Sequence, residues 1–314
     1  MEEMKMLDMI IIGSGPAGLT AAIYAARAGL DALVLEKAPM SGGQITNTER
    51  VDNYPGLYGI GGFEMGMKFR EHAEAMQAKF TEAEALSIAK QEGFFTVATK
   101  EQTYETKTII LAGGTAYAQL NVEGEAQWKG RGVSYCATCD GAFFRNRVTA
   151  VVGGGDVAVS DALFLSKMCS RVYVIHRRDS LRAAESLQKK LFSLPNVEII
   201  WDSEVKKIAG SDHLEQIQVV NKKTGEETAL SVDGVFIAVG IRPQSEAFAD
   251  LVKTDENGYF VAGEDCRTNI EGIFAAGDIR TKKLRQVITA AADGANAVAS
   301  AREYLFKRTN SQEQ

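Results

Sequence analysis

Residues 7–36 read LDMIIIGSGPAGLTAAIYAARAGLDALVLE, and this stretch decides the fold. Its apolar run over 7–12 predicts a buried parallel strand, and the alanine-rich run over 19–28 predicts a helix that Gly29 ends. Residues 31–35 predict the next strand. Between the first strand and the helix lies Gly13-Ser14-Gly15-Pro16-Ala17-Gly18, which is G-x-G-x-x-G in the strand–turn–helix setting that a dinucleotide-binding motif requires.

Each glycine of this motif has its own task. Gly13 permits the tight turn, Gly15 lets the backbone approach a pyrophosphate, and Gly18 lets the helix pack closely on the strand. The helix N-terminus then presents free N–H groups and a partial positive charge to the phosphates. Glu36 follows 18 residues after Gly18, where it is placed to accept a hydrogen bond from a ribose 2′-hydroxyl.

The same unit recurs 140 residues further along the chain. Residues 147–152 predict a strand, 159–168 a helix and 171–175 a second strand, and the turn reads Gly153-Gly154-Gly155-Asp156-Val157-Ala158. The position of Glu36 is taken by His176, which Arg177, Arg178 and Arg182 follow. Guanidinium groups bind a 2′-phosphate, whereas a carboxylate would repel it. The first site is therefore predicted to suit FAD or NAD, and the second NADP.

A dithiol motif, Cys136-Ala137-Thr138-Cys139, precedes the second unit and is followed by Asp140. The C-x-x-C spacing brings two sulfurs together across one turn and favours a lowered thiol pKa at a helix N-terminus. Next to two dinucleotide sites, such a pair can exchange two electrons with a flavin. Asp140 could protonate a departing thiolate or cap a helix near Cys139, and the sequence leaves both roles open.

A zinc half-site is the alternative interpretation of the two cysteines. Structural zinc takes four ligands, yet Cys169 and Cys266 are isolated and the three histidines are scattered. We therefore predict no metal site, and we expect Cys169 and Cys266 to be small buried residues.

The length, composition and net charge limit the classes of protein to which the chain can belong. A chain of 314 residues suggests about two domains, and 30 glycines with only five prolines favour placed turns over disorder. The net charge of −6 argues against a general attraction to nucleic acid or anionic membranes. No run reaches the roughly 18 apolar residues of a membrane span, and the acidic N-terminal stretch is not expected to be a secretory signal. We expect a cytoplasmic protein. Residues 287–306 predict a helix and 308–314 a polar tail.

The motifs resemble those of the bacterial and archaeal low-molecular-weight thioredoxin reductases across essentially the whole chain. The segments that carry the resemblance are GSGPAG at 13–18, GGQ at 42–44, NYPG at 53–56, CATCDG at 136–141, GGGDVA at 153–158, HRRDSLRA at 176–183, GIFAAGD at 272–278 and RQV at 285–287. A cysteine pair just ahead of the second glycine turn is specific to this branch, because related flavin reductases carry the pair in the FAD domain.

The resemblance implies an α/β fold with two Rossmann-like domains. The FAD-binding domain would be discontinuous, at 1–115 and 246–314, and the inserted NADPH-binding domain at 119–242 would carry the redox cysteine pair. The resemblance also implies a homodimer that serves cell redox homeostasis. The residues expected toward FAD are Gly13, Ser14, Gly15, Pro16, Ala17, Gly18, Glu36, Gly43, Gln44, Asn53, Gly277, Asp278, Arg285, Gln286 and Val287. Those expected toward NADPH are Gly153, Gly154, Gly155, Asp156, Val157, Ala158, His176, Arg177, Arg178 and Arg182.

The same resemblance implies a thioredoxin-disulfide reductase. Electrons would pass from NADPH to FAD, then to the Cys136–Cys139 pair, and then to thioredoxin as a transient protein substrate. In the family, the residue matching Cys139 lies nearer the flavin, the one matching Cys136 attacks thioredoxin, and the one matching Asp140 is the acid–base residue.

The chain departs from the family pattern after its second glycine turn. Val157 stands where a hydroxyl residue is usual, which removes one possible pyrophosphate contact, and Ser160-Asp161 stands for a Glu-Glu pair. Three other functions stay open: reduction of another dithiol partner, such as a glutaredoxin-like protein or a peroxide-reducing system; supply of electrons by ferredoxin; and a nucleotide-binding redox sensor without turnover. A sample without a flavin spectrum would favour the sensor.

Overall fold

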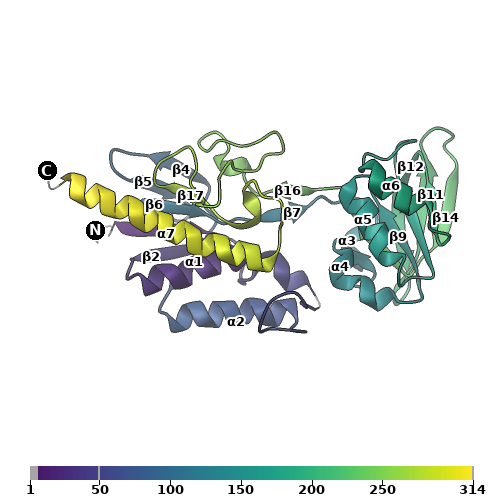
Figure 1. Ribbon diagram of the computed structural model, residues 1–314, viewed down its shortest axis with the longest axis horizontal. Helices are drawn as coiled ribbons and strands as arrows, with labels where there is room; N and C mark the ends of the chain where they lie inside the picture. The colour runs from purple at the N-terminus through teal and green to yellow at the C-terminus, as the bar shows by residue number, and fades with distance from the viewer. Residues whose placement is uncertain (1–5, 49, 313–314) are drawn as a thin grey trace. The chain divides into compact units, whose positions relative to one another are not determined.

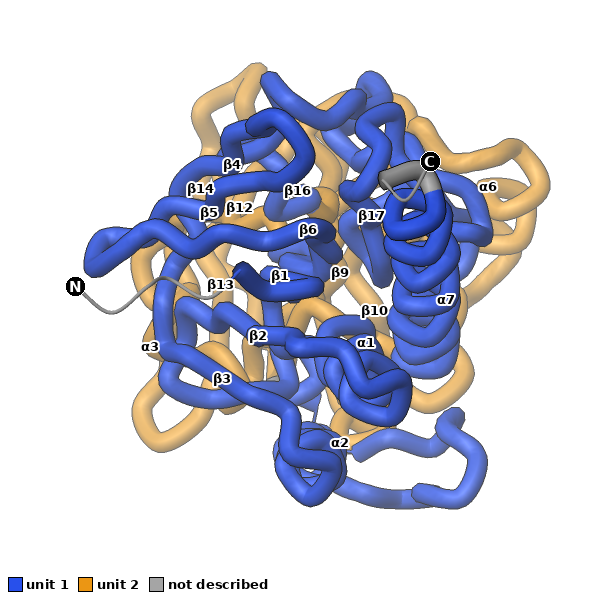
Figure 2. The backbone as a smooth tube through the Cα atoms, turned by 90° about the vertical axis from the view of Figure 1, so that its left-hand side faces the viewer, with its two compact units in different colours: residues 1–116, 242–314 blue, residues 117–241 orange. Residues whose placement is uncertain are grey.

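The computed structural model describes residues 6–48 and 50–312, and the chain divides into two compact units. Unit 1 comprises Met1–Ala116 and Arg242–Gln314, and unit 2 comprises Tyr117–Ile241 (Figure 2). The chain leaves unit 1 through strand β7 (Thr115–Tyr117) and returns through β16 (Ile241–Pro243), and these two strands pair with each other. One unit is thus inserted into the sequence of the other.

Unit 1 is built on a seven-stranded sheet with the order β3-β2-β1-β6-β5-β4, in which β17 also pairs with β6. Its strand β1 pairs in parallel with both β2 and β6, so that Ile11 lies opposite Val34 and Ile110. The strands are β1 (Leu7–Ile12), β2 (Ala32–Glu36), β3 (Lys79–Glu82), β4 (Ser87–Lys90), β5 (Phe95–Ala98), β6 (Thr103–Leu111) and β17 (Ile273–Ala275).

Helices cover one face of this sheet, where α1 and α7 lie side by side (Figure 1). Because side chains alternate along a strand, Met9 and Ile11 pack among the alanines of these helices, whereas Ile10 packs into a second core on the opposite face. The helices are α1 (Pro16–Arg27), α2 (Gly62–Ala75) and α7 (Val287–Gln312), with short 3₁₀ turns η1 (Gly43–Asn47), η3 (Glu246–Phe248) and η4 (Gly277–Ile279).

Unit 2 has a five-stranded parallel sheet in the order β11-β10-β9-β15-β8 and a three-stranded antiparallel sheet in the order β12-β13-β14. Its helices are α3 (Glu125–Trp128), α4 (Ala137–Asp140), η2 (Gly141–Phe144), α5 (Asp156–Leu165) and α6 (Glu185–Phe192). Its strands are β8 (Val133–Ser134), β9 (Val148–Val152), β10 (Arg171–Ile175), β11 (Val197–Ile200), β12 (Ser203–Gly210), β13 (Leu214–Asn221), β14 (Glu227–Ser231) and β15 (Gly234–Ile237).

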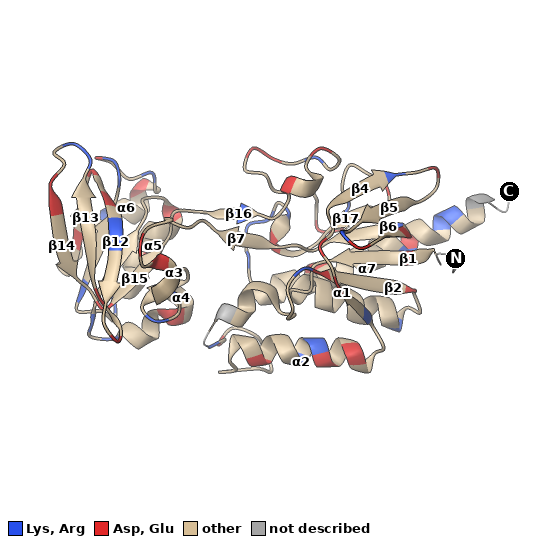
Figure 3. Cartoon of the chain, turned by 180° about the vertical axis from the view of Figure 1, so that it is seen from behind, with Lys and Arg blue, Asp and Glu red and all other residues tan. Residues whose placement is uncertain are grey.

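The predicted α/β fold is confirmed in both units, because β1-α1-β2 and β9-α5-β10 are each a strand–helix–parallel strand unit. The buried strand β17 carries no charged residue, whereas helix α2 carries residues of both signs (Figure 3). None of the helices within the described ranges is long and apolar enough to cross a membrane.

Several helix boundaries differ from the sequence prediction. Helices α1 and α5 each begin three residues earlier than predicted, at Pro16 and Asp156, because the turn residues after the second glycine already have helical conformation. The predicted polar tail is wrong up to Gln312, since α7 continues to that residue with Arg308 bonded to Tyr304 one turn earlier. Residues 313–314 of that predicted tail lie outside the described residues.

Candidate functional site

The glycine turn of unit 1 is shaped by close backbone contacts. A Cβ on Gly13, whose φ is +103°, would lie 2.5 Å from the Ala112 carbonyl oxygen, and a Cβ on Gly18 would lie 1.8 Å from the Gly13 carbonyl oxygen. Gly15, in contrast, faces open space, with no described atom within 4 Å of a Cβ built there. No described side chain caps the N-terminus of α1. The turn therefore leaves both room and free N–H groups for an anion.

Glu36, at the end of β2, is bonded to this turn. Its Oε2 accepts hydrogen bonds from the backbone N–H and the hydroxyl of Ser14, both at 2.7 Å, and its Oε1 accepts from the N–H of Ala38 at 2.9 Å. Ser14 is fully buried. A carboxylate has about four acceptor sites, so Glu36 keeps capacity for a further donor beside the glycine turn.

The GGQ motif lies directly against the same turn. The N–H of Gly42 donates to the Ser14 carbonyl at 2.8 Å, and a Cβ on Gly43 would lie 3.2 Å from the Cα of Gly15. The side-chain amide of Gln44 donates to the carbonyl oxygen of Thr115 and to its hydroxyl, the latter at 2.7 Å. Residues 42–44 are thus held between the first glycine turn and the start of β7.

Two hydrogen bonds join other residues that are predicted to lie toward the flavin. Asn53 donates from Nδ2 to Oε1 of Gln286 at 2.8 Å, which joins the NYPG motif to the RQV motif. Val287 begins α7 directly after that bond. Arg285 donates from Nε to the Asp278 carbonyl at 3.4 Å, and its guanidinium lies 4.0 Å from the centre of the Tyr259 ring.

The surroundings of Asp278 fit a bound cofactor. It follows Gly277, whose Cβ, if present, would lie 2.9 Å from the Cβ of Ala17 at the start of α1. Oδ1 of Asp278 is buried and has no hydrogen-bond partner among the described residues. Burial raises the pKa of this carboxyl. A buried oxygen without a donor is rare in folded proteins, and the hydroxyl groups of a sugar-alcohol chain such as that of FAD would supply the missing partner.

The glycine turn of unit 2 has the same open position. Gly155 has no described atom within 4 Å of a built Cβ, and no described side chain caps α5, which it precedes. Ala158, the third position of the motif, is fully buried. Val157, which stands where the family usually has a hydroxyl residue, is 58 % exposed in the first turn of this helix. The N–H groups of α5 are therefore available to a pyrophosphate, with no hydroxyl beside them.

His176 packs beneath this turn instead of facing solvent. A Cβ on Gly154 would lie 2.2 Å from Cε1 of its ring, and only 4 % of His176 is exposed. Its Nε2 lies 3.0 Å from the Ser180 carbonyl, which can only accept, so this nitrogen carries the proton. Burial lowers the pKa of His176, and Arg182, Arg178 and Arg177 lower it further. The ring is thus a neutral support for the turn.

The three arginines of the second site are exposed at the end of β10 and just beyond it. The backbone N–H of Arg182 donates to the Gly154 carbonyl at 2.7 Å, which folds this segment onto the glycine turn. Asp156 reinforces the fold, since its Oδ1 accepts from the N–H of Ala184 at 2.8 Å. The side chains of Arg177, Arg178 and Arg182 form no ion pair with any residue that the structure describes, so their positive charge is uncompensated beside the turn.

The dithiol motif forms a disulfide between Cys136 and Cys139, with an S–S distance of 2.03 Å. Cys136 precedes the short helix α4, and both cysteines are half-buried. Ser134 donates from its hydroxyl to Oδ2 of Asp140 at 2.6 Å, and the same hydroxyl accepts the N–H of Cys136 at 3.1 Å. A carboxyl is therefore tied by one hydroxyl to the backbone of the first cysteine.

The remaining cysteines agree with the sequence prediction. Cys169 and Cys266 are free and buried, and burial raises the pKa of both thiols, to about 12 for Cys266. Within residues 6–48 and 50–312, no cluster of three or more His, Cys, Asp or Glu residues could hold a metal ion.

Sequence reasoning missed three polar residues that organise these sites: Ser134, Lys282 and Asp293. Asp293 is buried on α7 and accepts hydrogen bonds from Gly277, Arg280 and Lys282. The sequence did offer a signal for Asp293, because an acidic residue within an alanine-rich helix is unusual. Ser134 and Lys282 carry no such signal, because their partners are set by the fold.

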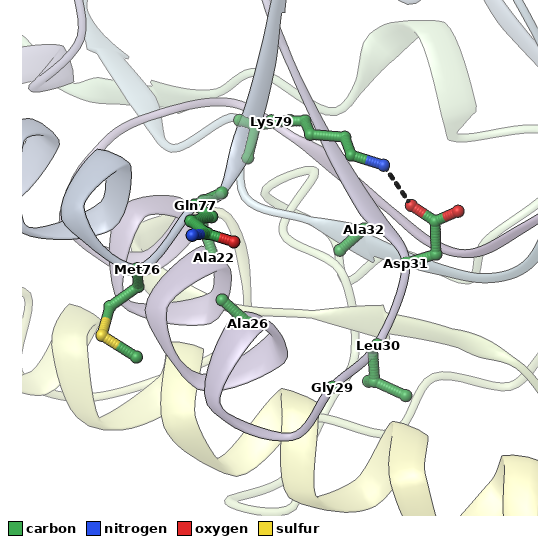
Figure 4. Close-up of a pocket in the computed structure, with 11 residues that line it drawn as sticks. Ala22, Ala26, Gly29, Leu30, Asp31, Ala32, Met76, Gln77 and Lys79 are labelled. Atoms are coloured by element: carbon green, nitrogen blue, oxygen red, sulfur yellow. Dashed lines mark hydrogen bonds and ion pairs between the residues drawn. The ribbon is translucent and has the colours of Figure 1, made fainter.

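A separate cavity of about 260 Å³ opens where α1 ends (Figure 4). Its lining includes Ala26, Gly29 and Gln77, and Lys79 pairs with Asp31 at 2.7 Å beside it. Because α1 is 12 residues long, its two ends lie about 18 Å apart. The cavity is therefore distinct from the glycine turn at the start of that helix.

Two dinucleotide-type turns and a C-x-x-C disulfide define a nucleotide-dependent disulfide oxidoreductase. Residues 7–294 match the pyridine nucleotide-disulphide oxidoreductase family, and the chain belongs to it. Within this family it resembles thioredoxin reductases over nearly its full length. The thioredoxin reductase of Listeria innocua is 44% identical over 304 residues, which are 96% of this chain and 95% of the relative. The Bacillus subtilis thioredoxin reductase is 42% identical over 306 residues, 97% of this chain and 96% of the relative.

The solved structures agree. The crystal structure of thioredoxin reductase from Streptococcus pyogenes superposes with a TM-score of 0.88 at 44% identity, covering 97% of this chain and 100% of that one. The resemblance inferred from the motifs is confirmed.

Proposed function

We propose that this chain is a thioredoxin-disulfide reductase that uses FAD and NADPH. One observation carries the proposal. The Cys136–Cys139 disulfide lies in the unit whose glycine turn is flanked by three arginines without an ion pair to any described residue. The other unit combines its glycine turn with Glu36 and with Asp278, whose buried Oδ1 has no hydrogen-bond partner among the described residues. Such an arrangement provides a different dinucleotide site in each unit and a two-electron acceptor.

Unit 1 would bind FAD. Its glycine turn and Glu36 would hold the adenosine half, with the free N–H groups of α1 directed to the pyrophosphate. Asp278 would accept hydrogen bonds from the ribityl chain. The remaining contacts toward the flavin would come from Gly43, Gln44, Asn53, Gly277, Arg285, Gln286 and Val287.

Unit 2 would bind NADPH. The turn over 153–158 would hold the pyrophosphate, while Arg177, Arg178 and Arg182 would bind the 2′-phosphate in charge-assisted, bidentate contacts. His176 would support the turn from below, and Asp156 would hold the arginine segment against it.

When bound, FAD would supply the chemistry that joins hydride transfer from NADPH to reduction of a disulfide. Reduction breaks the Cys136–Cys139 bond with two electrons and two protons. The Cys136 thiolate then attacks the thioredoxin disulfide, which forms a mixed disulfide and releases one thioredoxin thiolate. The Cys139 thiolate attacks Cys136, which restores the internal disulfide and releases the second. Asp140, whose carboxylate accepts a hydrogen bond from Ser134, would move the protons that these thiolates take up.

The finer assignments belong to the same proposal: a homodimer in the cytoplasm, with FAD on residues 1–115 and 246–314 and NADPH on 119–242. The experiment that tests it is an anaerobic titration of two samples of the purified protein, one with NADPH and one with NADH, each followed by addition of oxidised thioredoxin. We expect bleaching of the flavin by NADPH, little by NADH, and reoxidation by thioredoxin. Bleaching by reduced ferredoxin alone would favour a ferredoxin-fed enzyme, reoxidation only by another dithiol protein would change the partner, and a colourless protein would favour a sensor.

A further inference from the structure

The hydroxyl of Thr138, inside the C-x-x-C motif, lies 3.4 Å from the sulfur of Cys136. A disulfide sulfur carries no hydrogen, so the hydroxyl is the donor in this contact and the sulfur the acceptor. Thr138 is exposed, whereas Cys136 and Cys139 are half-buried. Among the described residues, no side chain donates a hydrogen bond to the sulfur of Cys139. The two sulfurs of the pair therefore have different surroundings.

The backbone and the core hold this contact in place without help from the disulfide. The carbonyl oxygen of Cys136 accepts the N–H of Cys139 at 3.2 Å and the N–H of Asp140 at 3.1 Å. Between the two cysteines, Ala137 is 1 % exposed and packs in a hydrophobic core of unit 2. Because none of these contacts involves a sulfur, we expect the turn to keep the Thr138 hydroxyl beside the Cys136 sulfur when the disulfide is reduced.

We propose that Thr138 is a catalytic residue whose hydroxyl stabilises the thiolate of Cys136 in the reduced enzyme. The inference rests on the proposed function, in which Cys136 attacks the thioredoxin disulfide. Two electrons and one proton break the sulfur–sulfur bond and give a thiolate at Cys136 and a thiol at Cys139. A hydrogen bond to a charged acceptor is about twice as strong as one to a neutral acceptor, so the hydroxyl favours the ionised dithiol form over the disulfide. It thereby directs ionisation to the cysteine that acts as the nucleophile.

The test measures the dithiol–disulfide equilibrium of the holoenzyme in mixtures of reduced and oxidised dithiothreitol, at about pH 9, above the ordinary cysteine pKa of about 8.5. Dithiothreitol supplies the two electrons as it closes to its cyclic disulfide, and its two thiol protons pass to the reduced cysteines or to water. Alkylation after denaturation, followed by mass spectrometry, gives the fraction of protein in which Cys136 and Cys139 are reduced. Thr138→Val keeps the shape of the side chain and removes the hydroxyl. We expect its equilibrium to shift about fivefold toward the disulfide, since water replaces only part of the lost hydrogen bond.

Two further variants separate the hydroxyl from other effects of substitution. Thr138→Ser keeps the hydroxyl and should retain the wild-type equilibrium. Thr224→Val, at an exposed threonine between β13 and β14 of the same unit, should also match the wild type. An unchanged equilibrium in Thr138→Val would overturn the inference, as would an equal shift in Thr138→Ser. The measurement contains no thioredoxin, so a wild-type enzyme that fails to reduce thioredoxin would overturn the proposed function without altering this equilibrium.

Discussion

Ser134 donates a 2.6 Å hydrogen bond to the carboxylate of Asp140. The same hydroxyl accepts the N–H of Cys136 at 3.1 Å, so one side chain fixes the carboxyl relative to the backbone of the cysteine pair. Ser134 is itself buried and belongs to β8, where it lies opposite Phe236 of β15. The orientation of the proposed acid–base residue thus depends on a serine outside the C-x-x-C motif.

Replacing this serine tests that dependence. In Ser134→Ala, Asp140 loses a hydrogen bond worth about 1.5 kcal/mol, so we expect thioredoxin reduction to slow by about tenfold. Flavin reduction by NADPH should keep its rate, because it precedes the thiol steps. Stopped-flow measurement of the two half-reactions separates these effects, with the exposed Ser170→Ala as control. An equal loss in both half-reactions would contradict the role given to Ser134.

The cysteine pair can be tested with a matched control in the same unit. Cys136→Ser should leave bleaching of the flavin by NADPH intact and abolish thioredoxin reduction, because it removes the thiolate that forms the mixed disulfide with thioredoxin. Cys169→Ser changes a free, buried cysteine and should retain turnover. Coupled turnover with oxidised thioredoxin measures both. Survival of turnover in Cys136→Ser would exclude the pair as the electron relay.

Arg177 and Arg178 predict a preference for NADPH over NADH. Replacing Arg177 and Arg178 with Ala removes charge-assisted phosphate contacts of about 1.5–3 kcal/mol each, so KM for NADPH should rise at least tenfold while KM for NADH changes little. Arg171→Ala is the control, since this exposed arginine lies at the start of β10, the strand that precedes the segment, and pairs with Glu198 at 3.8 Å. Parallel losses for both nucleotides would show that the segment does not read the 2′-phosphate.

The carboxyl of Asp161 should make the free energy of unfolding depend on pH in an unusual way. Burial on α5 raises the pKa of this carboxyl from an ordinary value of 3.8 to about 7. The folded state therefore retains a proton that the unfolded state has already lost, and the stability that Asp161 contributes is complete below about pH 4 and lost as the pH rises through 7. We expect Asp161→Asn to be about 2 kcal/mol more stable than the wild type at pH 8 and nearly equal to it close to pH 4.

Urea unfolding at both pH values measures this difference. Asp212→Asn, a change at an exposed aspartate in the loop between β12 and β13, serves as the control and should behave as the wild type at each pH. If Asp161→Asn raised the free energy of unfolding equally at both pH values, the increase would not come from titration of Asp161.

The local parts of the two sites were predictable from the sequence. The turns at Gly13 and Gly153 and the adjoining strands depend on neighbouring residues, on glycine conformation and on apolar alternation, all of which are written in short stretches. The disulfide also joins residues only three apart, so its spacing alone indicated the pairing chemistry. Helix starts were displaced because the turn and the helix share residues.

Other features depended on contacts between distant segments. His176 aligned with Glu36 by sequence, yet the fold buries its ring under Gly154, while Glu36 bonds to Ser14. Which side chain faces a ligand and which one supports the backbone depends on the packing around it.

The sequence by itself determined two βαβ units, two contrasting ribose positions and a redox pair, because short-range geometry and residue chemistry suffice for these. Only the tertiary structure decided that Ser134 holds Asp140, and that Asp293 gathers Arg280 and Lys282. Hydrogen-bond directions and the balance of buried charge depend on which groups share a water-free volume, and folding brings those groups together from separate elements.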